Sequence, residues 1–473
     1  MQSNLKNRRE EWFLVVFLPL VIIGYYIIPK KYTKVKNIIL LIASLIFYSF
    51  GEPKYTILMV VSILVNYILT LLMSKKNNNK VIFVFTIIID IGILVFFKYS
   101  NFIINNINNV FNTNFNNLNI DLPLGISFYT FQIMSYVIDV YKKKIKPQKS
   151  LINIATYITL FPQLVAGPIV NYKTIENELE KRNETFEKFA SGFRRFIVGL
   201  AKKVIIANNA AILADSIFNS DIQNLGTSII WIGALAYSIQ IYFDFSGYSD
   251  MAIGLGRIFG FNFLENFNYP YISKSITDFW RRWHISLSSW FKEYVYIPLG
   301  GNRCKKIKWF RNIFIVWMLT GLWHGASWNY VLWGIYFAVI LIIEKVFLLK
   351  ILEKVPNFFK HIYSIILILI GWVIFRVEDI HNLLYCLKHL VIYKPTDFSV
   401  FISNNGDVLS IIPFIFIGIL FSTPIIKKIH EKICNTNNEL LFYAEDIIII
   451  ALFIISMAFI VSLSYNPFIY FKF

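Results

Sequence analysis

The sequence predicts an all-α integral membrane protein that crosses the bilayer many times, and three observations support this fold class. Of the 473 residues, 56% are hydrophobic and only 16% are charged, whereas soluble domains carry about 45–50% apolar and about 25% charged residues. The chain also contains 45 Phe and 27 Tyr, which a soluble fold of this length could hardly bury. Apolar runs long enough for a transmembrane helix recur throughout, so we expect roughly 10–12 spans in one membrane-embedded domain, residues 1–473.

The expected spans follow the apolar runs in order. They are 12–29, 37–51, 55–73, 81–98, 122–141, 226–243, 311–345, 361–376, 409–426 and 443–463. The run 311–345 is too long for one span, and segments 151–170 and 190–218 meet the length criterion less clearly. We divide the domain into N-terminal spans (12–150), a central part with the candidate site (151–345) and C-terminal spans (346–473).

The first apolar run and the lysine-rich loops set the expected orientation. The run follows basic residues, as in a signal peptide, but no small-residue cleavage site follows it, so we expect a retained span. Lysine groups at 30–36, 75–80 and 142–149 are each separated by two spans, which places them on one side, the cytoplasmic one. The N-terminus and the Asn-rich stretch 104–119 are then outside, although basic residues 6–9 oppose this.

The net charge of +18 resides largely in such short loops. The positive-inside rule accounts for this distribution. We therefore expect the partner to be the lipid bilayer and no nucleic acid.

Two segments differ from ordinary spans. Residues 161–168 contain two prolines and a glycine within an apolar run, and irregular backbone at membrane depth requires burial in protein or a cavity. They predict a re-entrant loop or, as an alternative, a kinked span. Residues 266–300 are amphipathic and rich in Trp, which predicts helices lying in or dipping into the interface.

Two histidines in the apolar half of the chain are the candidate catalytic residues. His284 and His324 are 40 positions apart, and each follows a tryptophan, Trp283 or Trp323. An ionisable side chain at membrane depth is a functional-site hypothesis by default. The pair therefore indicates a proton-handling centre within the bilayer.

We expect His324 to lie on a helix with a glycine-lined face. In a continuous helix Gly321 lies one turn before His324, and Ser327 and Trp328 lie one turn after it. Gly321 and Gly325 form a G-x-x-x-G pattern, which serves either helix packing or, in the reading we favour, the approach of a slender substrate arm to the imidazole.

The chemistry expected of His324 is general base catalysis. A desolvated imidazole stays neutral at physiological pH, so it can take the proton of an acceptor hydroxyl. The sequence has no Ser or Cys in a G-x-S-x-G context. Direct attack of the activated hydroxyl on a bound thioester is then the simplest reaction.

His284 has a different setting, in which Arg281, Arg282 and Trp283 precede it directly. On a helix, Arg281 at i−3 and Ser288 at i+4 share its face. The alternative to a functional role is an interfacial histidine in an aromatic belt. The functional interpretation is a residue that orients the acceptor or the acyl carbonyl, with the two arginines and Trp283 shaping the site.

Two acids after the run 226–243 predict a structural feature rather than a catalytic one. Asp244 and Asp250 enclose Ser, Tyr and Gly residues, and we expect a hydrogen-bonded polar corner that fixes the next helices. The three cysteines, Cys304, Cys386 and Cys434, are widely separated, so no metal site or disulfide framework is predicted.

Six stretches of the chain resemble the membrane-bound O-acyltransferase (MBOAT) family, specifically its bacterial branch typified by the alginate O-acetyltransferase membrane subunit. They are residues 122–132, 161–168, 242–250, 279–288, 294–303 and 321–328. The resemblance implies a ring of tilted helices around a thin membrane centre, with funnels entering from both faces. It also implies that the family's two histidines are His284 and His324, the latter matching the main catalytic one.

The resemblance implies a function as well. The family moves an acyl group from a cytoplasmic thioester to an acceptor on the far side of the membrane. We expect a multi-pass protein of the bacterial plasma membrane that takes acetyl from acetyl-CoA or another thioester, with no bound cofactor, for O-acetylation of a cell-surface polysaccharide or peptidoglycan. Because the chain has no extramembrane hydrolase-like domain, we expect an extracellular transferase of the SGNH type to complete delivery to the glycan.

Two alternatives remain open at this point. The related D-alanyl transfer proteins of teichoic acid synthesis share the Arg-x-Trp-His core, but they are shorter and lack the continuation at 297–303. A transporter or flippase would use the histidines as proton relays, but it predicts broken helices in two related halves, and no such halves are visible.

The C-terminal residues 466–473 resemble a terminal aromatic motif of the same branch. Its proposed role implies that Tyr470 carries the acyl group onward to a partner. An interfacial aromatic anchor is the alternative.

Overall fold

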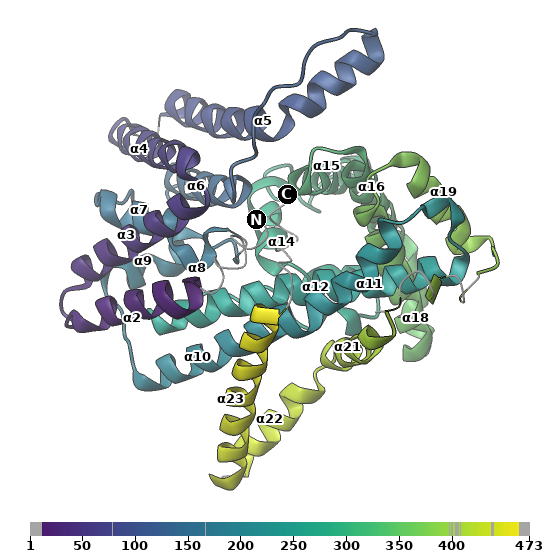
Figure 1. Ribbon diagram of the computed structural model, residues 1–473. Coiled ribbons are helices and arrows are strands. Elements are labelled where there is room, and N and C mark those ends of the chain that lie inside the picture. Colours follow the sequence, from purple (N-terminus) through teal and green to yellow (C-terminus); the bar gives the residue numbers. More distant parts are fainter. Residues whose placement is uncertain are drawn as a thin grey trace. The chain divides into compact units, whose positions relative to one another are not determined.

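The computed structural model describes residues 12–77, 79–165, 167–396, 398, 401–402, 406, 408–436 and 439–462. All regular elements within these ranges are helices (Figure 1), which confirms the predicted all-α class. The chain separates into two compact units, residues 1–196 with 249–264, and residues 197–248 with 265–473. Each unit is described by itself, and the single-domain assignment stays a prediction.

Within the described residues, seven helices are long and apolar enough to cross a membrane, or eight if one bent pair counts as a span. They are α3 (Thr33–Gly51), α4 (Pro53–Lys75), α5 (Lys80–Phe111), the continuous stretch Phe186–Phe218, α12 (Thr227–Ile258), α18 (Asn357–Arg376) and α23 (Glu439–Ser462). The bent pair is α21 (Val408–Phe421) with α22 (Ile425–Asn435), at an angle of 63°. The chain is therefore a multi-pass membrane protein.

This number is below the 10–12 predicted spans because several apolar runs form shorter helices. The shorter helices are α2 (Leu18–Ile27), α6 (Ile126–Tyr141), α7 (Leu151–Thr159) and α16 (Trp328–Ile343), whereas α15 (Lys306–His324) has 19 residues but is not apolar enough to count as a span. Hydropathy reports how apolar a segment is but not where its helix ends. A run that is buried against protein need not have the length of a bilayer crossing.

In the first unit, the chain is interrupted where the prolines at 161–168 predicted irregular backbone. Helix α7 ends at Thr159, and a four-residue helix, α8 (Phe161–Leu164), follows it. The Phe161 N–H donates to Ser44 Oγ over 3.0 Å, and Tyr157 donates its hydroxyl to the Val170 carbonyl over 2.8 Å. These bonds satisfy backbone groups inside the protein, as irregular structure at membrane depth requires.

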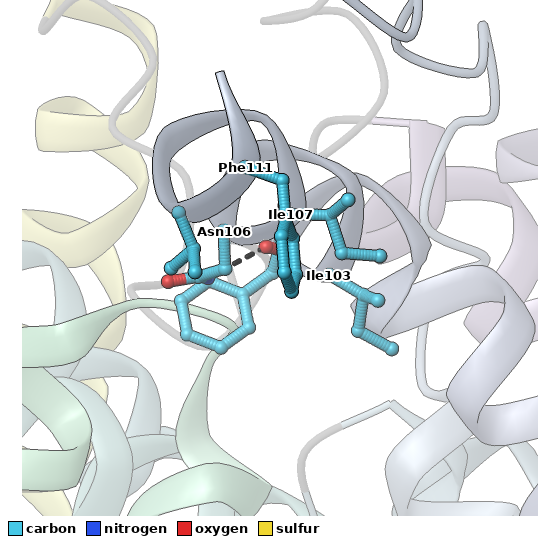
Figure 2. Close-up of a pocket in the computed structure, with 6 residues that line it drawn as sticks. Ile103, Asn106, Ile107 and Phe111 are labelled. Carbon is cyan, nitrogen blue, oxygen red and sulfur yellow. Dashed lines mark hydrogen bonds between the residues drawn. The ribbon is translucent and has the colours of Figure 1, made fainter. Parts of the chain in front are cut away.

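A shallow pocket on the last turns of α5 also belongs to the first unit (Figure 2). Its one polar lining residue, Asn106, donates its amide to the Phe102 carbonyl over 2.7 Å. None of the six described residues that line it is ionisable, so we assign it no chemistry.

In the second unit, the segment predicted to lie in the interface forms short helices whose large side chains are mostly buried in protein. It forms α13 (Ile276–Arg282), α14 (Ile285–Phe291) and the π-helix η5 (Lys292–Tyr296). Its large side chains, such as Phe279 and Trp283, are 0% and 1% exposed. Their position relative to the lipid interface stays a prediction, because an amphipathic aromatic pattern fits both a lipid interface and a protein interior.

The predicted polar corner at Asp244 and Asp250 is wrong in its backbone, because both acids lie inside the continuous helix α12. Each carboxylate pairs with a cation from an earlier helical segment. Asp244 pairs with buried Lys203 of the π-helix η2 (Lys202–Ala207), and Arg195 Nη2 lies 2.7 Å from Asp250 Oδ1. The two acids thus stabilise the packing of helices through ion pairs. This agrees with a structural role, although no turn forms at these residues.

Candidate active site

His284 occupies a break between two short helices rather than the middle of one. Helix α13 ends at Arg282, and His284 is the N-cap of α14 with φ 45° and ψ 56°. This left-handed conformation is uncommon for a residue other than glycine. The expectation that Arg281 and Ser288 share one helical face with His284 is therefore wrong.

A neighbouring loop holds this break from both sides. The Asn268 N–H donates to the Arg282 carbonyl over 2.9 Å, and the Ile285 N–H donates to the Asn266 carbonyl over 2.9 Å. The loop thus runs beside residues 282–285 and pairs with the chain before and after His284. These hydrogen bonds on both sides of the break hold His284 in a sparsely populated backbone conformation.

The side chain of Asn266 fixes the imidazole of His284. His284 Nδ1 lies 3.1 Å from Asn266 Oδ1, which also accepts from the Ser286 N–H over 3.1 Å and from Ser286 Oγ over 2.9 Å. A backbone N–H can only donate, so the Asn266 atom is the amide oxygen, and His284 Nδ1 must donate to it. This bond assigns the neutral tautomer in which Nε2 carries the lone pair.

His284 is buried among aromatic rings. Its exposed fraction is 1%, and its ring centroid lies 4.6 Å from that of Phe245 and 5.8 Å from that of Trp323. Burial lowers the pKa of His284 from its ordinary value, because an apolar surrounding disfavours the charged imidazolium. The neutral form therefore persists at physiological pH.

His324 is the last residue of α15, and Gly325 continues in an extended conformation with φ −173°. The predicted continuation of this helix to Ser327 and Trp328 is wrong, since Ser327 is the N-cap of α16. This helix boundary was not predicted because the apolar run 311–345 continues on both sides of it. The candidate base thus lies at the point where the α15–α16 hairpin turns, and the two helices lie side by side in Figure 1.

The imidazole of His324 is enclosed by three aromatic side chains. Its centroid lies 5.0 Å from that of Trp323, 5.1 Å from that of Trp333 and 5.1 Å from that of Phe375, all with the rings near perpendicular. The residue is 3% exposed. Edge-to-face contacts of this kind orient a ring as well as bury it.

Trp323 joins the two predicted histidines. Its ring contacts both His284, at a centroid distance of 5.8 Å, and His324, at 5.0 Å. Residues 40 positions apart in the sequence are therefore gathered around one indole within the second unit. This convergence of two buried imidazoles is the central geometric feature of the site.

The two glycines near His324 serve helix packing. A Cβ added to Gly321 would lie 2.2 Å from the Tyr330 carbonyl oxygen, and one added to Gly325 would lie 2.2 Å from the Tyr330 ring. Residue Tyr330 of α16 therefore fills the space beside both glycines. The structure favours the packing alternative over the predicted passage for a substrate arm.

Gly321→Ala is expected to destabilise the protein by about 1–3 kcal/mol, the usual cost of overpacking. The added methyl would meet a backbone carbonyl, which cannot rotate away as a side chain can. Thermal unfolding of the purified protein in detergent measures the effect. Gly92→Ala in α5 is the control, because a Cβ there meets nothing within 4 Å. Equal melting temperatures for the two variants would refute the packing role.

The other predicted site residues surround the break at His284. Arg282 pairs with Asp278 at 3.0 Å and donates to the Asn268 carbonyl over 3.2 Å, so it helps to hold the loop. Trp283 packs against Trp372 at a centroid distance of 4.7 Å. Arg281 is exposed, and Ser288 Oγ donates to the Trp280 carbonyl over 3.5 Å.

Four residues at the site, Asn266, Ser286, Trp333 and Phe375, were not predicted from the sequence. No periodicity links Asn266 to His284, because the contact is made between a loop and a helix break. An isolated asparagine among aromatic residues was the only available signal. Tyr470 lies outside the described residues, so its proposed relay role stays a prediction.

Comparison with known proteins identifies the family. The model of the MBOAT, membrane-bound O-acyltransferase family, matches residues 146–387. The chain is 43% identical over 376 residues to the Pseudomonas aeruginosa protein named "Probable alginate O-acetylase AlgI", covering 78% of this chain and 71% of that protein. It is 36% identical over 415 residues to the peptidoglycan O-acetyltransferase of Helicobacter pylori, covering 80% and 78%.

A third relative matches a smaller part of this chain. The teichoic acid D-alanyltransferase of Bacillus subtilis is 34% identical over 232 residues, which is 46% of this chain and 58% of that protein. The match to the family model includes both His284 and His324. The chain belongs to the membrane-bound O-acyltransferase family and is an acyltransferase.

Proposed function

We propose that this acyltransferase moves acetyl from a cytoplasmic thioester, acetyl-CoA, across the bacterial plasma membrane for O-acetylation of a cell-surface polysaccharide or peptidoglycan. The observation that carries the proposal is the convergence of His284 and His324 on Trp323 in the second unit. The relatives support the acetyl group, because the two that cover most of this chain are named for O-acetyl transfer.

In the proposed reaction, His324 acts as the general base. Its imidazole takes the proton of the acceptor hydroxyl while the hydroxyl oxygen attacks the thioester carbonyl. The new C–O bond forms, the C–S bond breaks, and the thiolate leaves with the proton that the imidazolium returns. The aromatic enclosure of Trp323, Trp333 and Phe375 supports this role, because exclusion of water protects the thioester from hydrolysis.

The hydrogen bond to Asn266 limits the kind of substrate group that His284 can bind. With Nδ1–H donated to Asn266, a neutral His284 offers a lone pair at Nε2, which can accept a hydrogen bond but cannot donate one. It therefore suits a second hydroxyl or another donor group of the acceptor. It does not suit the acyl carbonyl, which requires a donor.

The substrates and partners complete the proposal. The thioester serves as a substrate, with no bound cofactor, and it enters from the cytoplasmic side. The acceptor lies on the outer side, where a separate extracellular transferase of the SGNH type delivers the acetyl group to the glycan. Tyr470 is the candidate that would carry the group to this partner.

Membranes containing the protein distinguish acetyl transfer from D-alanyl transfer. They are incubated with radiolabelled acetyl-CoA or, in parallel, with a labelled D-alanyl thioester, and label is followed in cell-envelope glycans. We expect label from acetyl-CoA to exceed that of membranes lacking the protein. Label from D-alanine alone would replace the acetyl proposal with teichoic acid D-alanylation.

A further inference from the structure

Asn266 is a buried polar residue in the second unit that bonds to the site without belonging to a helix. Its exposed fraction is 1%. It contacts the His284 region through two different groups, since its carbonyl accepts from the Ile285 N–H and its amide oxygen accepts from His284 Nδ1 and Ser286. One residue therefore holds both the backbone after His284 and the imidazole itself.

The arrangement determines which nitrogen of His284 carries the proton. The backbone N–H of Ser286 keeps the Asn266 amide oxygen turned towards the imidazole, because reversal of the amide would place two donors against each other. An oxygen at 3.1 Å from Nδ1 stabilises the Nδ1–H tautomer. The other tautomer would leave two lone pairs facing each other at this position.

We propose that Asn266 is a positioning residue that keeps His284 in the Nδ1–H tautomer, so that Nε2 remains the nitrogen that accepts a hydrogen bond from the acceptor. This inference rests on the proposed function, because it assigns Nε2 to the acyl acceptor. Asn266 acts through His284 and takes no part in bond making. Its role is analogous to that of any buried group that orients a reactive imidazole by accepting from its other nitrogen.

The surroundings of His284 determine what a charge at position 266 would do. The contacts on the imidazole come from Asn266, Ser286, Phe245 and Trp323. Ionisable residues on these elements include Glu265, next to Asn266 in the loop, Asp244 of α12, which pairs with Lys203, Arg281 and Arg282 of α13, the latter paired with Asp278, and His324 of α15. A carboxylate in place of the Asn266 amide would be the closest new charge to the ring.

Two substitutions separate positioning from simple packing. Asn266→Leu keeps the volume but removes the acceptor, and we expect kcat for acetyl transfer to fall about 10- to 100-fold, as for loss of other groups that orient a reactive histidine. Asn266→Asp keeps the acceptor and adds a negative charge that stabilises the imidazolium. We expect it to retain most of the activity at high pH.

The pH profile provides the readout that a structural role would not move. Activity requires both His284 and His324 to be neutral, so it is lost as the pH falls through the higher of their two pKa values, and position 266 acts on the pKa of His284. In Asn266→Asp the carboxylate raises that pKa, and the acid limb of the kcat profile should move to higher pH than in the wild type. Asn268→Ala is the control, because this exposed residue bonds to the break through its main chain; its profile should match the wild type.

The outcomes distinguish this inference from the proposed function. Wild-type kcat in Asn266→Leu, or activity of Asn266→Asp at high pH that is no higher than that of Asn266→Leu, would overturn the positioning role, provided that His284→Ala is inactive. Full activity of His284→Ala would instead remove His284 from the proposed site and the inference with it. If Asn266→Leu does not accumulate in membranes, the activity of Asn266→Asp at high pH decides alone, and a loss as large as that of His284→Ala would overturn the positioning role.

Discussion

His324→Ala is expected to lower acetyl transfer by about 10²- to 10⁴-fold, the range attributable to general base catalysis. The proposed base would be absent, while the aromatic side chains around it would remain. The measurement is the initial rate of label transfer from acetyl-CoA to envelope glycans in membranes with matched amounts of each protein. Because truncation also leaves a cavity, His324→Gln is tested in parallel; it is similar in volume, and its amide is not a base.

The matched control for this experiment is His381→Ala. His381 is exposed on α19 (Ile380–Val391) and has no assigned role. We expect its rate to equal that of the wild type. Rates for both His324 variants within a few-fold of the control would refute the assignment of His324 as the base.

Glu344→Ala is expected to lower the free energy of unfolding by at least about 3 kcal/mol, since hydrogen bonds to a charged group contribute about 1.5–3 kcal/mol each. Glu344 is 0% exposed. Its carboxylate accepts from the backbone N–H groups of Ile276 and Thr277, both over 2.7 Å, from Thr277 Oγ1 over 2.6 Å and from Tyr363 OH over 3.1 Å. Removal would leave four donors without their acceptor, one in a buried and three in part-buried hydrogen bonds.

Thermal unfolding in detergent measures this effect. Glu353→Ala, at an exposed position on α17 (Leu349–Lys354), is the control for loss of one acidic residue. Glu344→Gln should fall between the two, because its amide oxygen can replace only one of the two acceptor oxygens. A melting temperature of Glu344→Ala equal to that of Glu353→Ala would contradict the anchoring role.

The helical membrane fold and the two candidate histidines could be predicted from the sequence. Both depend on composition and on the free-energy cost of polar groups within a bilayer. The excess of apolar residues required a helical membrane protein, because a bilayer leaves backbone groups no partner outside a helix or barrel. The same cost argument selected His284 and His324. Both are buried, and Trp323 contacts both.

The helix boundaries inside the site could not be predicted in the same way. The breaks at His284 and after His324 occur where no proline interrupts the chain. They are set by tertiary contacts, such as the loop at Asn266 and the packing of Tyr330 against Gly321. The local sequence pattern does not reveal a contact between residues 18 positions apart, such as Asn266 and His284.

The place of Trp323 between the two imidazoles has a consequence for selectivity. Glu344, the C-cap of α16, accepts hydrogen bonds from the start of α13. These contacts and the Trp323 ring hold the histidine pair in a preassembled arrangement within the protein. A preassembled centre needs little reorganisation energy during the reaction. In the proposed reaction, the enzyme therefore does not discriminate between substrates by assembling its catalytic groups around the correct one. Substrate selection then depends on the paths by which the donor and the acceptor reach His284 and His324.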